Sequence, residues 1–187
     1  MKQILLHTSI VCFFIFFLNV GCGKKSTQNE HQLNTVQYLS IDSVKNALMH
    51  TEDFGEIKLV ESHCVIDEPD SLANDTYQVT FDLLDNFTSA DLNKDGYADV
   101  IGSMAYNAGG TGTFVSMEIF LNQQGSARHT ASYLIGDRIK PDSIIVRIDT
   151  INLYFKDRLP DEPMSGPGSI VTHKMLKLLD NGIIELN

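Results

Sequence analysis

Residues 77–83 read YQVTFDL, a stretch in which every second side chain is apolar. Residues 115–121, VSMEIFL, show the same alternation. A period of two is typical of a strand with one buried and one solvated face. Further strands are expected at 57–61, 98–106, 128–135, 144–148, 151–156, 170–178 and 183–186. Short strands at intervals of about ten residues, with no helical stretches between them, predict an antiparallel rather than a parallel sheet.

Turn residues separate several of these strands. The segments 122–125 (NQQG), Asp149-Thr150 and Asn181-Gly182 predict hairpins, and the last is typical of a type I′ turn. Residues 159–168 hold three prolines and two glycines, which predicts a loop. One short helix is expected within 40–50, where Ile41, Val44, Ala47 and Leu48 recur at helical spacing after the possible N-caps Ser40 and Asp42. The expected fold class is mainly β, a β-rich α+β domain with an antiparallel sheet and one short N-terminal helix.

The N-terminus has the pattern of an export signal. Lys2 precedes a run, 10–20, that is apolar except for Asn19, and Gly21-Cys22 follows it. This arrangement resembles a bacterial lipoprotein signal, in which the cysteine becomes the acylated mature N-terminus, carrying palmitate-type chains. The alternative is an ordinary cleaved signal with an incidental cysteine. The organisation we expect is a signal peptide at 1–21, a flexible polar tether at 22–36 and a single β-rich domain at 37–187.

Composition limits the possible partners. Without residues 1–21 the chain keeps 13 basic and 24 acidic residues, a net charge of −11. Since no segment forms a basic stripe, we expect no nucleic-acid binding. Cys12 leaves with the signal and Cys22 is the predicted lipidation site, so Cys64 has no partner and no internal disulfide is expected. Its neighbours Val65 and Ile66 predict a buried, inert thiol.

One motif carries chemistry. Residues 91–99 read DLNKDGYAD, a D-x-N-x-D-G-x-x-D loop. Oxygen side chains at alternate positions converge when glycine allows a sharp turn, and the expected calcium ligands are Asp91, Asn93, Asp95, the Tyr97 carbonyl and Asp99. Gly102 stands where an EF-hand has glutamate, and strands flank the loop, so it resembles the loops of integrin-type and related secreted β-rich repeats. The ion's predicted role is structural, and the alternative is an acidic turn without metal.

A family resemblance rests on four motifs between residues 89 and about 172. They are the 91–96 loop, 109–114 (GGTGTF), 136–139 (GDRI) with Ser143-Ile144, and 161–164 (DEPM). Their order resembles a group of uncharacterised bacterial envelope lipoproteins. The resemblance implies location and fold, and it supplies no mechanism. In those relatives a cysteine pair follows the last motif, whereas Ser165-Gly166 follow it here.

Three hypotheses about function remain open. The first is a non-catalytic, lipid-anchored envelope protein whose calcium-stabilised β domain binds a protein or glycan. It is membrane-attached through Cys22, and because Gly23 rather than a retention aspartate follows this cysteine, we expect the outer membrane. The second is a secreted enzyme using acids such as Asp137 or Asp161, although Asp137-Arg138 is better explained as a structural ion pair. The third is a periplasmic inhibitor or assembly factor acting through a strand edge or the 159–168 loop.

Overall fold

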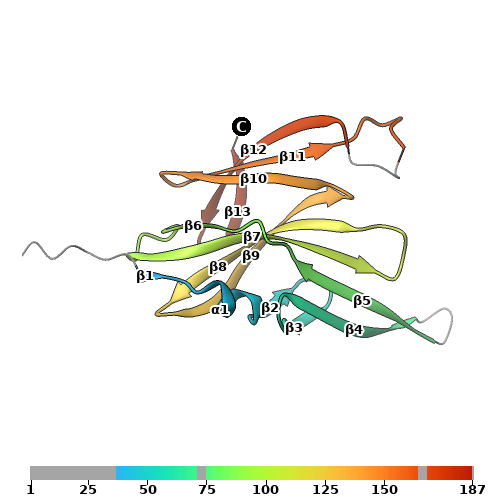
Figure 1. Cartoon of the computed structure of the whole chain (residues 1–187), viewed down its shortest axis with the longest axis horizontal. Coiled ribbons are helices and arrows are strands. Elements are labelled where there is room, and N and C mark those ends of the chain that lie inside the picture. The colour runs from blue at the N-terminus through green and yellow to red at the C-terminus, as the bar shows by residue number, and fades with distance from the viewer. Residues whose placement is uncertain (1–36, 71–74, 164–167, 187) are drawn as a thin grey trace, which may run out of the picture. The chain divides into compact units, whose positions relative to one another are not determined.

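The computed structural model describes residues 37–70, 75–163 and 168–186; the predicted signal, Cys22 and the tether lie outside these ranges. This part of the chain is strand-rich with one short helix, which confirms the mainly β prediction (Figure 1). The elements are β1 (Gln37–Tyr38), α1 (Ile41–Lys45), β2 (Leu48–Thr51), β3 (Gly55–Lys58), β4 (His63–Asp70), β5 (Asp75–Leu83), β6 (Thr88–Ala90), β7 (Tyr97–Ala108), β8 (Phe114–Gln123), β9 (Ser126–Asp137), β10 (Lys140–Arg147), β11 (Thr150–Asp157), β12 (Ile170–Leu179) and β13 (Gly182–Leu186).

The strands form two sheets and a separate hairpin. The main sheet has the order β4-β5-β7-β8-β9, and the short strands β1 and β6 also pair with β7. A second sheet has the order β10-β11-β12-β13, and β2 pairs with β3 alone. Among the described strands every pairing is antiparallel except that of β1 with β7.

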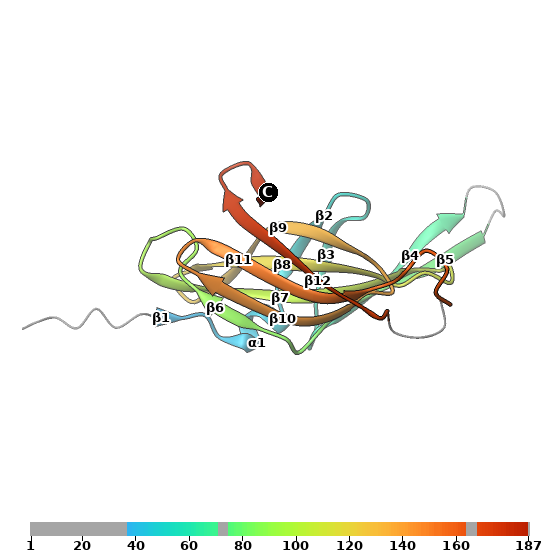
Figure 2. The same ribbon diagram turned by 90° about the horizontal axis from the view of Figure 1, so that it is seen from above.

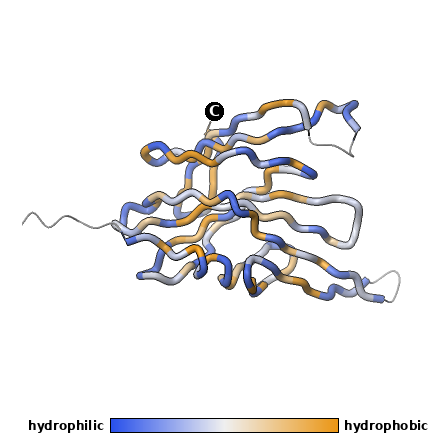
Figure 3. Tube along the Cα trace, viewed as in Figure 1, coloured by the Kyte–Doolittle hydropathy of each residue, from blue (hydrophilic) through white to orange (hydrophobic). Residues whose placement is uncertain are grey.

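Two hydrophobic cores lie on the two faces of the main sheet. In β7, Val100 belongs to the core shared with α1 and the β2–β3 hairpin, whereas Ile101 belongs to the core shared with β10, β11 and β12. Figure 1 shows the second sheet and the α1–hairpin layer on opposite sides of β7 and β8, and Figure 2 shows the same strands from above, where these layers overlap. These two strands are therefore buried on both faces, and Figure 3 shows the apolar residues recurring along the strands.

The N-terminal helix is shorter than the sequence predicts. It ends at Lys45, and Leu48 to His50, expected to be helical, belong to β2. Met49 pairs with Ile57 of β3, and both side chains are buried in the first core. Pairing and burial at period two outweigh the helical spacing of the apolar residues here. This helix, the only one in the described ranges, is too short to cross a membrane.

Two further differences concern an edge and a turn. The edge strand β4 was not predicted; it carries charged residues and Pro69, which oppose edge-to-edge pairing. The hairpin at Asn181-Gly182 is confirmed, but its type I′ assignment is wrong, because in this loop only Gly182 has a positive φ, 123°. Asp180 and Asn181 form the loop, and Gly182 already pairs with Leu179 as the first residue of β13.

Candidate functional site

The predicted calcium loop connects β6 to β7. Ala90 pairs with Asp99 at its base, so strands flank the loop on both sides as expected. The chain reverses through two residues of positive φ, Lys94 at 64° and Gly96 at 89°. Glycine adopts this conformation without the Cβ clash of other residues, which explains its place at position six.

Hydrogen bonds hold the side chains of this loop together. The Asp91 carboxylate accepts the backbone N–H groups of Asp95 and Gly96, at 3.1 and 3.0 Å. Asp95 in turn accepts the Tyr97 N–H at 2.8 Å and the Asn93 amide at 2.9 Å. The loop thus gathers two carboxylates, one amide and the Tyr97 backbone on a single turn.

Asp99 is placed differently from the other expected ligands. It is fully buried, and its two oxygens accept the N–H groups of Leu92 and Asn122 at 2.9 and 2.8 Å. Burial raises the pKa of Asp99 most strongly; the two N–H groups oppose this, and the charges of Asp95 and Asp91 add to it. The carboxylates are therefore close enough to repel one another.

The donor set is compatible with calcium. Carboxylate, amide and carbonyl oxygens are the ligands that this hard cation takes. Within residues 37–70, 75–163 and 168–186, no three His, Cys, Asp or Glu side chains form a group already able to hold a metal ion. Ion binding would therefore require Asp91, Asn93 and Asp95 to reorient, with Asp99 as the neighbouring charge.

Asn122 is a residue that sequence reasoning missed. Its side-chain amide donates to the carbonyls of Gln37 and Ala98, at 3.0 and 3.1 Å, and its backbone donates to Asp99. It is buried and connects β1, β7 and the β8–β9 turn beside the acidic loop. The sequence places it in the 122–125 turn, but its hydrogen-bond partners are more than 20 residues away along the chain and could not be predicted.

A second polar cluster lies on β8 and β9, next to Phe120 of the first core. Glu118 on β8 is fully buried, and its carboxylate accepts three side-chain hydrogen bonds. Ser116 donates to Oε1 at 2.5 Å; Ser132 and the His129 ring contact Oε2 at 2.6 and 2.7 Å. A buried charge is costly unless it is paired in this way.

A bulge in β9 makes this cluster possible. Ile119 pairs with Ala131 and Phe120 with His129, so Thr130 is left over in the register. Without the extra residue, His129 and Ser132 would point to opposite faces of the sheet; with it, both reach Glu118. Sequence alternation alone could not reveal this, because it assigns 129 and 132 to different faces.

The cluster lacks the geometry of a nucleophilic triad. In a triad the carboxylate and the serine contact different nitrogens of the histidine ring. Here Glu118 and Ser132 both approach His129 Nε2, at 2.7 and 3.3 Å, and Nδ1 accepts the backbone N–H of His50 at 3.3 Å. Ser132 donates to the Glu118 carboxylate, and the His129 ring is not arranged as the base of a triad.

A pocket opens beside Glu118. It has a volume of about 210 Å³ and is lined by Thr51, Glu52, Asp53, Phe54, Phe81, Met104, Tyr106, Ser116, Glu118, Ser132 and Leu134. The first four belong to β2 and the β2–β3 turn, and the others come from four adjacent strands of the main sheet. This pocket was not predicted from the sequence.

Of the two other acids singled out from the sequence, Asp137 has structural contacts and Asp161 lies in a loop. Asp137 pairs with Arg138 at 2.9 Å and accepts the Thr113 N–H, which confirms the expected ion pair. Asp161 lies in the described part of the predicted 159–168 loop, where no strand or helix is found. Cys64 is free and only partly buried, against the first core, whereas full burial was expected.

No protein-family model, curated protein or solved structure matches the chain. The resemblance to envelope lipoproteins therefore stays a prediction from the motifs, and the function has to be inferred from the loop and the pocket.

Proposed function

We propose that the protein is a lipid-anchored module of the bacterial cell envelope, non-catalytic, with a structural calcium ion in the 91–99 loop. The observation that carries the proposal is the closed loop, in which Asp91 and Asp95 are held together by backbone N–H groups. The envelope location rests on the Gly21-Cys22 junction. The domain would bind a protein or glycan ligand while anchored to a membrane, the outer one in a two-membrane cell.

Calcium would stabilise the domain by relieving repulsion. Asp91, Asp95 and Asp99 bring three negative charges to one end of β7, and Asp99 is buried there. A cation between them removes a cost that the metal-free domain carries. The non-catalytic assignment is supported by Glu118, whose carboxylate is satisfied by three hydrogen bonds and whose histidine is not placed to activate a serine.

Calcium binding is tested by thermal unfolding of the purified domain. Millimolar calcium is expected to raise Tm, by roughly 5–10 °C at a hundredfold excess over Kd. Asp95→Ala is expected to abolish most of the rise. Asp67→Ala is the matched control, since Asp67 is an exposed acid on the edge strand β4, outside the motif. An equal calcium response in wild type and Asp95→Ala would refute the site.

Anchoring is tested separately in cells. Cys22→Ala is expected to abolish acyl labelling and release the protein from the membrane fraction, whereas Cys12→Ala and Cys64→Ala leave both unchanged. Density-gradient separation then distinguishes the outer from the inner membrane. Acyl labelling that survives in Cys22→Ala would show that the lipid is not on this residue.

A further inference from the structure

The pocket beside Glu118 has the size of a small-molecule site. Its floor is formed by strands of the main sheet and its roof by the β2–β3 turn, where Thr51 Oγ1 accepts the Phe54 N–H and donates to the Gly55 carbonyl. A protein cavity of about 150 Å³ is known to hold benzene. At about 210 Å³ this pocket suits a ligand of roughly eight non-hydrogen atoms.

The charge of the pocket is negative. Glu52, Asp53 and Glu118 contribute to its lining, and no Lys, Arg or His is among the lining residues. The first two are exposed on the β2–β3 turn, and Glu118 lies at the floor. Asp53 is close enough to Tyr106 for its charge to add to burial in raising the pKa of that phenol. A recess lined by one sign of charge concentrates ligands of the opposite sign.

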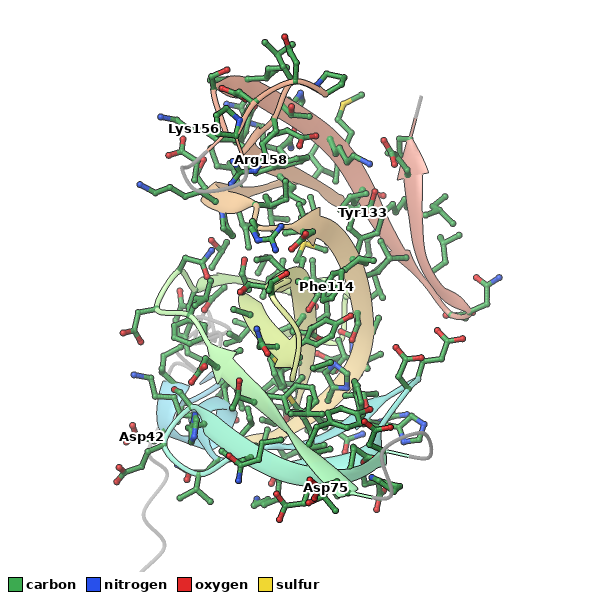
Figure 4. The ribbon with its side chains drawn as sticks, turned by 90° about the vertical axis from the view of Figure 1, so that its right-hand side faces the viewer. Asp42, Asp75, Phe114, Tyr133, Lys156 and Arg158 are labelled. Atoms are coloured by element: carbon green, nitrogen blue, oxygen red, sulfur yellow. The ribbon has the colours of Figure 1, made fainter. Side chains whose placement is uncertain are left out.

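The remaining lining residues are three hydroxyl side chains, from Thr51, Ser116 and Ser132, and a larger aromatic and apolar group. The rings of Phe54, Phe81 and Tyr106 contact one another, with centroids 5.6, 6.3 and 5.9 Å apart. Phe114, labelled in Figure 4, stacks on Tyr106 from the other side at 5.2 Å. Leu134 lines the pocket with 57% of its surface exposed. Aromatic faces attract ammonium groups, and the effect grows when water is excluded.

We propose that this pocket binds a small organic cation, an amine or quaternary ammonium compound. The proposal rests on the proposed function as a binding module and adds a small-molecule ligand to the protein or glycan proposed above. Glu118 supplies charge rather than metal ligation, because Ser116, Ser132 and His129 already occupy its oxygens. The ammonium group would lie toward Asp53 and Glu52, with the ligand's carbon atoms against Phe54, Tyr106 and Leu134.

Matched probes of different charge test the proposal. Benzylammonium, tetramethylammonium and putrescine are titrated into ¹⁵N-labelled domain and followed by NMR, beside the neutral benzyl alcohol and the anionic benzoate. At least one cation is expected to bind with Kd on the order of 1 mM. The amide shifts should be confined to Phe81 and to residues 51–54, 104–106, 116–118 and 132–134. The neutral alcohol should bind at least roughly tenfold more weakly than benzylammonium, and benzoate not at all.

Variants at the mouth separate charge from shape. The double variant Glu52→Gln with Asp53→Asn is expected to weaken cation binding roughly tenfold and leave the fold intact, because both residues are exposed. Asp180→Asn makes the same type of change outside the pocket and should have no effect. No binding by any of the three cations, or equal binding of benzyl alcohol and benzylammonium, would overturn the proposal. The second result would leave the binding-module function standing, and the calcium and lipidation tests are independent of both.

Discussion

At the scale of single residues, the least predictable feature is the buried carboxylate of Glu118. The sequence places it at a polar position of a strand, Val115 to Leu121, that was expected to have one wet face. The structure covers that face with the β2–β3 turn, so Glu118 is fully buried. Its partners become neighbours only through strand pairing and the β9 bulge. By contrast, Gly96 was correctly predicted, because the turn needs a positive φ and this requirement is local.

Removing one donor to this carboxylate should be costly. Ser132→Ala deletes a 2.6 Å hydrogen bond to Glu118 Oε2, and hydrogen bonds to charged groups contribute about 1.5–3 kcal/mol. We expect a loss of that size in the free energy of unfolding, measured by urea denaturation. Ser126→Ala, on the exposed start of the same strand, should change it by less than about 0.5 kcal/mol. Equal effects of the two substitutions would mean that the Glu118 cluster is not stabilising.

At the scale of elements, alternation located most strands, and tertiary contacts explain the exceptions. The two central strands, β7 and β8, are buried on both faces. β4 is a strand because it pairs with β5, and the end of the predicted helix is a strand because it pairs with β3. In the hairpin between β10 and β11, the residue types that are typical of turns do not locate the loop correctly, because the loop includes an isoleucine. Its loop begins at Ile148, which has φ 61° and is 94% exposed, a conformation in which a β-branched side chain is strained.

Relieving this strain should stabilise the hairpin. Ile148→Asn replaces a β-branched residue by one that tolerates the left-handed region, and we expect a gain of about 1 kcal/mol. The measurement is the urea midpoint at unchanged m value. Ile145→Asn, on the preceding strand β10 with ordinary backbone geometry and 40% exposure, should not be stabilising. If both variants lose stability alike, Ile148 has an interaction that outweighs its strain.

At the scale of the whole domain, a polar cluster ties the main sheet to the second sheet. Tyr133 of β9, labelled in Figure 4, donates to Glu185 of β13 at 2.8 Å, and Lys174 of β12 donates to both at 2.8 and 3.0 Å. These contacts lower the pKa of Glu185, chiefly through Lys174, and raise the pKa of Lys174, chiefly through Tyr133. None of these pairs was foreseen, since they join segments about 10 to 50 residues apart.

The cluster predicts a dependence of stability on pH. Because the pKa of folded Glu185 is below its unfolded value of about 4.3, its contribution is present above that pH and is lost as pH falls through the folded value. Since the pKa of folded Lys174 is above about 10.4, its contribution is lost as pH rises through the folded value. In thermal unfolding, Glu185→Gln should reduce the fall of Tm with decreasing pH on the acid side. Glu56→Gln, at an exposed position of β3, should leave this fall unchanged. If Tm falls with decreasing pH in Glu185→Gln as steeply as in the wild type, Glu185 does not contribute to the pH dependence of stability.

Diffraction from crystals grown with calcium is the most direct test for an ion in the 91–99 loop. We expect an anomalous difference peak with oxygen ligands from Asp91, Asn93, Asp95 and the Tyr97 carbonyl at about 2.3–2.6 Å. Asp99 should lie close to the ion or bind it. Crystals of Asp95→Ala should lack the peak. A wild-type loop that keeps the hydrogen bonds of Asp91 and Asp95 to backbone N–H groups, with no anomalous peak in saturating calcium, would show that the motif is an acidic turn without metal.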